Sequence, residues 1–151
     1  MAANQIVESG TRQFIVVKIG AEQFGIDINY IDNIVRMQKI TRIPKAQHYF
    51  KGVINLRGEV VPVMSIRLKM GLEDDEFTNV TRIIIVKIEP QEALGIIVDE
   101  VKEVVTLEQS EIERVVKDSR EEKNSFINGI GKHNGELISL FDLNSIIVDN
   151  A

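Results

Sequence analysis

Two stretches of this 151-residue chain follow one pattern of residues. Each begins with glycine and a β-branched residue and continues through four variable residues to Gly-Glu. Two aliphatic residues, any residue, an aliphatic and a bulky apolar residue follow, and Ser or Asp with one more aliphatic residue ends the pattern. The copies are residues 52–66 and 129–143, at a constant spacing of 77 positions. A fixed spacing between similar segments is typical of repeated structural units, so it constrains the architecture before any single residue is interpreted.

The similarity extends upstream of these stretches. The further matches are 16–19 with 85–88 and 25–35 with 95–105. We therefore interpret residues 1–151 as a single domain with an internal repeat, approximately 12–70 and 81–147. A unit of about 60 residues hides only ~60% of its unfolded surface. We expect the two units to share a hydrophobic core, since each alone would be marginally stable.

Most of each repeat has the residue pattern of β-strands. Residues 14–19 predict a strand that turns at Gly20 and pairs with 23–28, and 40–43 predict a strand closed by a proline. After Asn29 and after Asp99 the apolar residues change to helical spacing, which predicts short helices.

Two hairpins and two capped helices are also expected. Gly58 is a candidate for positive φ, and Asn134-Gly135 favours a type I′ turn. Ser65 and Asp142 each stand before a short helix as N-cap residues.

The segments that differ between the repeats are more polar. Residues 72–78 read as a solvated acidic linker without a further role. We expect one helical turn and then an exposed loop in Glu108–Asn124, and a frayed N-terminal tail up to Thr11.

Composition excludes several function classes. The net charge is −5 and aromatic residues make up 5% with no tryptophan, which weighs against nucleic-acid binding because that binding needs basic and stacking side chains. No apolar run approaches the length of a membrane span, and there is no signal region. The absence of cysteine excludes disulfides and thiolate metal sites and fits a reducing cytoplasm.

No catalytic constellation is evident. His48 and His133 lie in different repeats without a ligand partner, and Gly129 to Lys132 lacks the glycine and the Ser or Thr of a phosphate loop. We therefore expect a binding module rather than an enzyme, with no cofactor and no metal. A site assembled from distant residues could still escape inspection of the sequence.

Arg57 stands out because it occupies a predicted turn between apolar strands. Two interpretations stay open at this point: an ordinary exposed arginine, or an anchor of an interface, where arginine is enriched and binds carboxylates or carbonyls in a fork.

Residues 52–63, followed by Ile66-Arg67, resemble the signature of the CheW family, the coupling proteins of bacterial chemotaxis. Residues 25–28, 40–44 and 129–143 also fit that family. The resemblance covers roughly 12–148, and Asn55-Leu56-Arg57-Gly58 is its most specific motif.

The resemblance implies an all-β fold of two SH3-like β-barrel subdomains that share a hydrophobic core. It implies a non-catalytic cytoplasmic adaptor that couples methyl-accepting chemoreceptor tips to the regulatory domain of the histidine kinase CheA, in arrays at the inner face of the membrane. The alternative is a regulatory or coupling domain of a larger two-component signalling protein with the same fold. Neither nucleic-acid binding nor membrane insertion is expected.

The resemblance also suggests binding residues. It ties Arg57 to receptor binding, with Gly58 and Gly52 shaping its turn beside Asn55. The receptor's helical hairpin is expected in a groove between the barrels, near a short helix that holds Ile31 and Asn33. The kinase is expected at the exposed hydrophobic end of a barrel, whose residues the sequence does not identify.

Ser65 departs from the family pattern, which usually has Asp at this position. Asp142 keeps the acid in the second repeat. Because Ser is nearly as good an N-cap as Asp, we expect Ser65 to be structurally neutral. If the family's Asp has a role that depends on its negative charge, Ser65 cannot perform that role.

Overall fold

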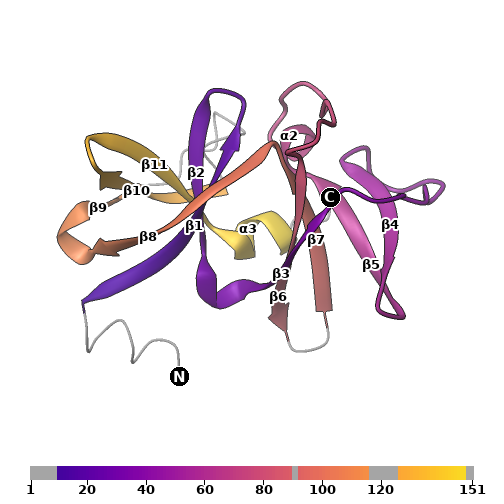
Figure 1. Ribbon diagram of the computed structural model, residues 1–151, viewed down its shortest axis with the longest axis horizontal. Helices are drawn as coiled ribbons and strands as arrows, with labels where there is room; N and C mark the ends of the chain where they lie inside the picture. The colour runs from indigo at the N-terminus through magenta and orange to yellow at the C-terminus, as the bar shows by residue number, and fades with distance from the viewer. Residues whose placement is uncertain (1–9, 90–91, 116–125, 149–151) are drawn as a thin grey trace. The chain divides into compact units, whose positions relative to one another are not determined.

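The fold is built almost entirely of β-strands, which confirms the all-β class (Figure 1). The structure is a computed structural model and describes residues 10–89, 92–115 and 126–148. The chain divides into two compact units. Unit 1 comprises Met1–Asn29 and Lys102–Ala151, and unit 2 comprises Tyr30–Val101.

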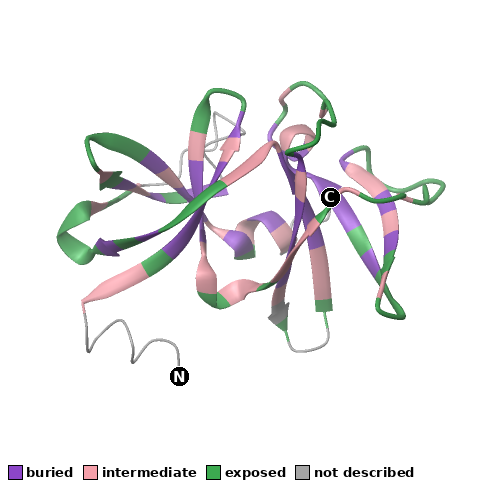
Figure 2. Ribbon diagram, in the orientation of Figure 1, coloured by how far each residue is buried: buried purple, intermediate pink, exposed green. Residues whose placement is uncertain are grey.

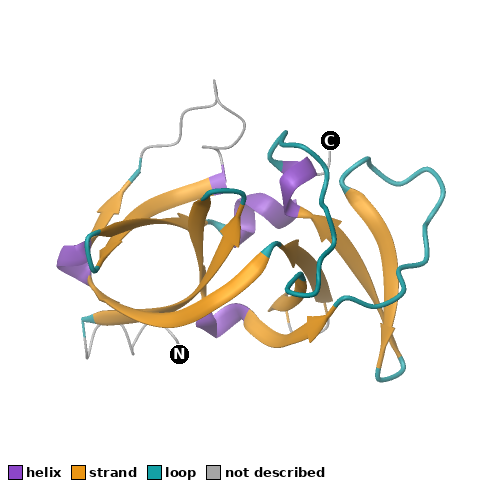
Figure 3. Ribbon diagram, turned by 45° about the horizontal axis from the view of Figure 1, so that its top comes forward, coloured by secondary structure: helices purple, strands orange, loops and turns teal. Residues whose placement is uncertain are grey.

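Unit 1 contains a six-stranded sheet in the order β8-β1-β2-β11-β10-β9, which curls into a barrel (Figure 3). Its elements are β1 (Thr11–Ile19), β2 (Glu22–Asp27), β8 (Glu100–Glu108), η2 (Gln109–Glu111), β9 (Ile112–Arg114), β10 (Ile127–His133), β11 (Glu136–Phe141) and α3 (Leu143–Val148). The core of unit 1 is a buried cluster of Phe14, Val16, Val105, Leu107, Ile138 and Leu140.

Unit 2 contains a five-stranded sheet in the order β3-β6-β7-β5-β4. Its elements are β3 (Ile31–Arg36), β4 (Phe50–Leu56), β5 (Glu59–Ser65), α2 (Ile66–Lys69), β6 (Arg82–Glu89) and β7 (Glu92–Val98), preceded by the 3-10 turn η1 (Ile28–Tyr30). Its core is a buried cluster of Ile54, Val61, Val63, Ile83, Ile85 and Ile97. In both units the buried residues lie mainly on the strands (Figure 2).

The two units do not coincide with the two repeats. In unit 1, β1 and β2 of the first repeat lie between β8 and β11 of the second. In unit 2, β6 and β7 of the second repeat lie between β3 and β5 of the first. Each repeat therefore contributes its first hairpin to the unit that the other repeat completes.

The register of this exchange follows the sequence repeat. Two strands from different repeats pair in parallel in each unit, with Val63 opposite Gly95 and Leu140 opposite Gly25. These two pairs are equivalent under the repeat. The β4–β5 and β10–β11 ladders also carry an irregularity at equivalent positions, before Gly52 and before Gly129.

The prediction of short helices after Asn29 and after Asp99 is wrong. A single 3-10 turn, Ile28–Tyr30, leads into β3, and residues 100–108 form β8. β-Branched residues lose side-chain freedom in a helix and pack well on a pleated surface. A distant partner strand decides the outcome, because β3 pairs along β6, with Ile34 opposite Ile84.

Two other expectations are only partly met. Residues 40–43 do not form a strand, although Thr41 makes an isolated bridge to Val53. The helical turn expected in 108–124 is present as η2, but it continues into the short strand β9. The expected loop at 116–125 lies outside the described residues, as does most of the expected N-terminal tail.

The predicted helix caps are confirmed. The backbone N–H of Leu68 donates to Ser65 Oγ at 3.1 Å, so Ser65 is the N-cap of α2. The backbone N–H of Ser145 donates to Asp142 Oδ1 at 3.4 Å, so Asp142 caps the start of α3. These bonds satisfy donors that have no partner within a first helical turn.

Candidate functional site: a hollow beside the Arg57 turn

The β4–β5 turn holds Arg57 in a left-handed conformation. Its φ is 53° and that of Gly58 is 82°, as expected for the glycine. The β10–β11 turn has the same form, with φ of 52° at Asn134 and 78° at Gly135. Positive φ at both central residues is the type I′ pattern, in which Asn is favoured at the first position. An arginine there costs about 1–2 kcal/mol, so its presence points to a role outside the turn.

Asn55 supports this turn from within. Its Oδ1 accepts a hydrogen bond from the backbone N–H of Gly58 at 3.2 Å. The side chain of Asn55 thus closes the loop that carries Arg57. We assign Asn55 and Gly58 to the shape of the turn.

The Arg57 side chain lines a hollow of about 400 Å³ in unit 2. Four apolar residues, half-buried or buried, line it: Leu56, Val61, Ile85 and Ala93. The polar residues that line it are Asp32, Asn33, Arg57, Glu59 and Lys87. An apolar surface with a few convergent polar groups is the usual form of a binding site.

The charged side chains of the hollow are not neutralised by their neighbours. Among the described residues, none of Asp32, Arg57, Glu59 and Lys87 forms an ion pair. Asn33 Oδ1 accepts from the backbone N–H of Ile34 at 2.8 Å, which leaves its amide nitrogen to donate elsewhere. The hollow therefore presents both signs of charge to a partner.

The structure brings together some of the residues selected from the sequence. Arg57 and Asn33 line the same hollow. Ile31 precedes Asn33 by two residues on β3 and pairs with Val86. The pairing of β3 with β6 is irregular between Ile31 and Asn33. These two positions lie on a strand, not on the expected helix.

Gly52 does not belong to the turn or the hollow. It is buried at the irregularity of β4, where residues 40–41 cross the strand. A Cβ at this position would lie 2.1 Å from the carbonyl oxygen of Thr41. Its role in the structure is this close crossing.

Sequence reasoning missed the other lining residues. Lys87 and Ala93 come from β6 and β7 of the second repeat, whereas Asp32, Leu56 and Glu59 come from the first. No local motif marks these residues, because the hollow forms only when the repeats exchange hairpins.

Comparison with known proteins decides the family. A family model described as a CheW-like domain matches residues 13–151. This chain belongs to the CheW family. The resemblance drawn from the Asn55–Gly58 motif is thereby confirmed.

Curated CheW relatives match most of the chain. Chemotaxis protein CheW of Bacillus subtilis is 35% identical and covers 89% of this chain and 86% of its own length. Chemotaxis protein CheW of Helicobacter pylori is 36% identical and covers 89% and 81%. The crystal structure of scaffolding protein TtCheW from Thermoanaerobacter tengcongensis matches with a TM-score of 0.83 at 29% identity, covering 92% of this chain and 94% of that one.

Two features of the described residues bear on other function classes. No helix there is long and apolar enough to span a membrane. No group of three or more His, Cys, Asp or Glu in the same ranges is arranged to hold a metal ion.

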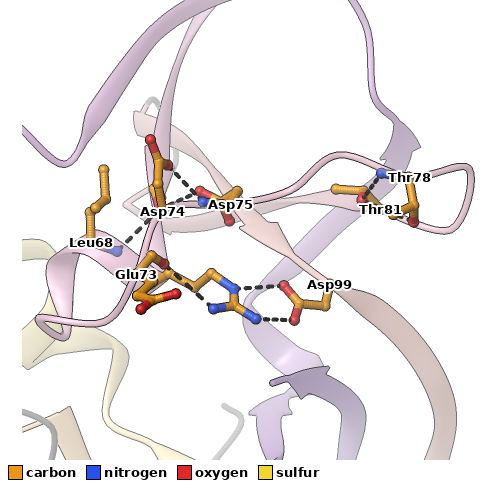
Figure 4. Close-up of polar contacts among 9 residues, drawn as sticks. Leu68, Glu73, Asp74, Asp75, Thr78, Thr81 and Asp99 are labelled. Atoms are coloured by element: carbon orange, nitrogen blue, oxygen red, sulfur yellow. Dashed lines mark hydrogen bonds and ion pairs between the residues drawn. The ribbon is translucent and has the colours of Figure 1, made fainter. Parts of the chain in front are cut away.

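Ser65 stands where the sequence pattern of the family led us to expect Asp. A carboxylate from another part of the chain, that of Asp75, lies beside it. Ser65 is fully buried, and its Oγ donates to Asp75 Oδ2 at 2.5 Å (Figure 4). Asp75 belongs to the linker that was expected to be solvated, and that expectation is wrong for this residue. The linker thus places an acid beside the N-cap of α2.

The linker is held at further points. Lys51 Nζ lies 2.6 Å from Asp74 Oδ1, and Arg67 Nη1 donates to the carbonyl of Glu73 at 3.4 Å. Arg67 also forms a two-bonded pair with Asp99, at 3.0 and 2.6 Å (Figure 4). The hydrogen bonds that Arg67 donates to the Asp99 carboxylate raise the pKa of Arg67.

A pH-dependent stability follows from Asp75. Burial raises the pKa of its carboxyl above the ordinary value of 3.8, and its Oδ1 is buried with no hydrogen-bond partner in the part of the chain that the structure describes. The folded protein therefore binds the proton more tightly than the unfolded chain, and protonation stabilises the fold as the pH falls through the raised pKa. Asp75→Asn removes this gain. In urea denaturation, the stability of the variant minus that of wild type should fall as the pH is lowered from neutral.

Asp74→Asn is the matched control. The hydrogen bond from Lys51 lowers the pKa of Asp74, so its carboxylate stabilises the fold above the ordinary pKa and loses that effect in acid. The variant-minus-wild-type difference should then rise weakly as the pH falls, because the Asp74 side chain is exposed. A difference for Asp75→Asn that does not change with pH would contradict the role of its burial.

Proposed function

We propose that this protein is a non-catalytic adaptor that couples the cytoplasmic tips of chemoreceptors to the histidine kinase CheA. The observation that carries the proposal is Arg57, which forms no ion pair with another described residue and is held in an unfavourable conformation beside a partly apolar hollow in a CheW-family chain. The similarity to a protein described as a scaffolding protein supports the same role.

The hollow suits the receptor tip proposed as its ligand. A helical hairpin presents carboxylates and aliphatic side chains on one face, at intervals of three and four residues. Arg57 can bind a carboxylate in a fork, while Leu56, Val61 and Ile85 can receive an aliphatic side chain. Asn33 and Lys87 add donors beside it. We include Ile31, Asn55 and Gly58 as residues that flank or shape this site, and Gly52 as a residue that acts on it only through the fold of β4.

The kinase side of the proposal rests on the family. The regulatory domain of CheA is expected to meet an apolar end of a barrel, and the protein would then act in the cytoplasm, in arrays at the inner face of the membrane. The role needs neither a cofactor nor a catalytic residue.

Reconstitution tests the proposed coupling. Purified protein is combined with CheA and with receptor fragments in vesicles, and kinase activity is measured as ATP turnover. Turnover should rise well above that of CheA with receptor alone, and attractant should lower it. Each two-component mixture serves as a control. A protein that binds neither the receptor nor CheA in the same assay would refute the adaptor role.

A further inference from the structure

Unit 2 carries two segments of opposite charge. Residues 36–51 include five Lys or Arg and no Asp or Glu, in a chain whose net charge is −5. Residues 72–80 include four acidic residues and no basic one. We call the first the basic loop and the second the acidic strap.

The basic loop forms a hollow of about 340 Å³. Arg42, Lys45, His48 and Lys51 supply its cationic and polar lining, and the hollow has no acidic lining residue. Neither Arg42 nor Lys45 forms an ion pair with another described residue. The hollow also has apolar walls, from Ile43, which is 48% exposed, from Pro44 and from the half-buried Phe50.

The acidic strap presents an aromatic residue among its carboxylates. Phe77 is 52% exposed and Val80 is 43% exposed. The strap is fixed on both sides of Phe77, by the bond of Asp75 to Ser65 and by the bond from the N–H of Thr78 to Thr81 Oγ1 at 2.8 Å. Phe77 is thus exposed on an anchored segment, so its entropy loss on binding is small.

The two surfaces adjoin each other. The ion pair of Lys51 with Asp74 joins the edge of the basic loop to the strap. When patches of opposite sign lie side by side, a two-fold rotation places each patch on the opposite patch of a second copy. This surface is therefore complementary to itself in charge. It also presents the exposed Phe77 side chain and a hollow with apolar walls that can receive it.

We propose that this face of unit 2 binds a second copy of the chain in a two-fold dimer. Phe77 of each copy enters the basic hollow of the other, while Glu73 and Glu76 face Arg42 and Lys45. Because exposed ion pairs are individually weak, the dimer forms at raised protein concentration and dissociates as salt screens the charges. This inference does not depend on the receptor or the kinase.

Sedimentation equilibrium of the purified full chain tests the dimer. Wild type should change from monomer to dimer with increasing concentration at low salt. Arg42→Glu with Lys45→Glu, or Glu73→Lys with Glu76→Lys, should each weaken the dimer about tenfold or more, because like charges then face each other. Lys102→Glu with Arg114→Glu, two exposed reversals on β8 and β9, changes the net charge as much as Arg42→Glu with Lys45→Glu and should leave the dimer unchanged.

Mixing the two double variants gives the decisive result. Each alone opposes like charges, but a mixed dimer opposes unlike charges at both contacts and should regain the wild-type association. A midpoint of thermal unfolding equal to that of wild type shows that both variants are folded. A wild type that is monomeric at every concentration, an association larger than a dimer, or a mixture that stays monomeric would overturn the proposal.

Discussion

Replacing Gly52 by alanine is expected to lower the free energy of unfolding by about 3–5 kcal/mol. The backbone there has a φ of 141°, and the added Cβ would lie 2.1 Å from the Thr41 carbonyl oxygen and 2.9 Å from Ile40 Cγ2. The nearest atoms are backbone, so no side chain can move aside. Residues 40–41 would have to move away from β4. This movement breaks both hydrogen bonds between Thr41 and Val53, each 2.8 Å long.

Gly58→Ala is the matched control for this prediction. It makes the same chemical change in the same hairpin and also has a positive φ, 82°, but no atom lies within 4 Å of the added Cβ. Only the conformational cost of about 1–2 kcal/mol remains. The midpoint of urea denaturation measures both effects. If Gly52→Ala costs no more than Gly58→Ala, residues 40–41 do not cross β4 as closely as described.

Arg57→Glu is expected to weaken receptor binding by about 2 kcal/mol or more, which is roughly 30-fold. The change reverses the only basic side chain at the tip of the β4–β5 turn, where the proposed site meets a carboxylate of the receptor. Titration calorimetry with a receptor fragment measures the affinity. Binding of CheA should stay within about twofold of wild type, since a residue outside an interface adds little to its affinity.

Arg57→Asn separates binding from stability. Asparagine suits the first position of a type I′ turn better than arginine, so this variant should unfold at the same or a higher denaturant concentration while it loses receptor affinity. Arg114→Glu, an exposed reversal on β9, is the net-charge control for Arg57→Glu. Receptor affinity that survives in both Arg57 variants would remove this residue from the site.

The local parts of this fold could be read from the sequence because each has a local cause. The hairpin of β1 and β2, the turn at Asn134-Gly135 and the caps at Ser65 and Asp142 depend on residues a few positions apart. The strand β3 was missed because the spacing of Ile31, Ile34 and Val35 fits a helix. What makes it a strand is β6, some 50 residues further along the chain.

The candidate site divides in the same way. Arg57 and Asn33 could be selected, since the first stands out in a turn and both fall within a family motif or its expected surroundings. Lys87 could not, because only the pairing of β6 with β3 brings it to the same hollow. Gly52 was selected because the family resemblance ties it to the Arg57 turn, but its close contact is with Thr41, which the sequence does not reveal.

The exchange of hairpins between repeats affects how the protein can be divided. A protease that cuts between α2 and β6 would not release two autonomous modules, since each product would lack two strands of the sheet to which it gives most of the strands. The two pieces would instead be obligate complements, each unfolded alone and structured once mixed. Fused to the halves of a split reporter, such pieces would signal only through their joint folding.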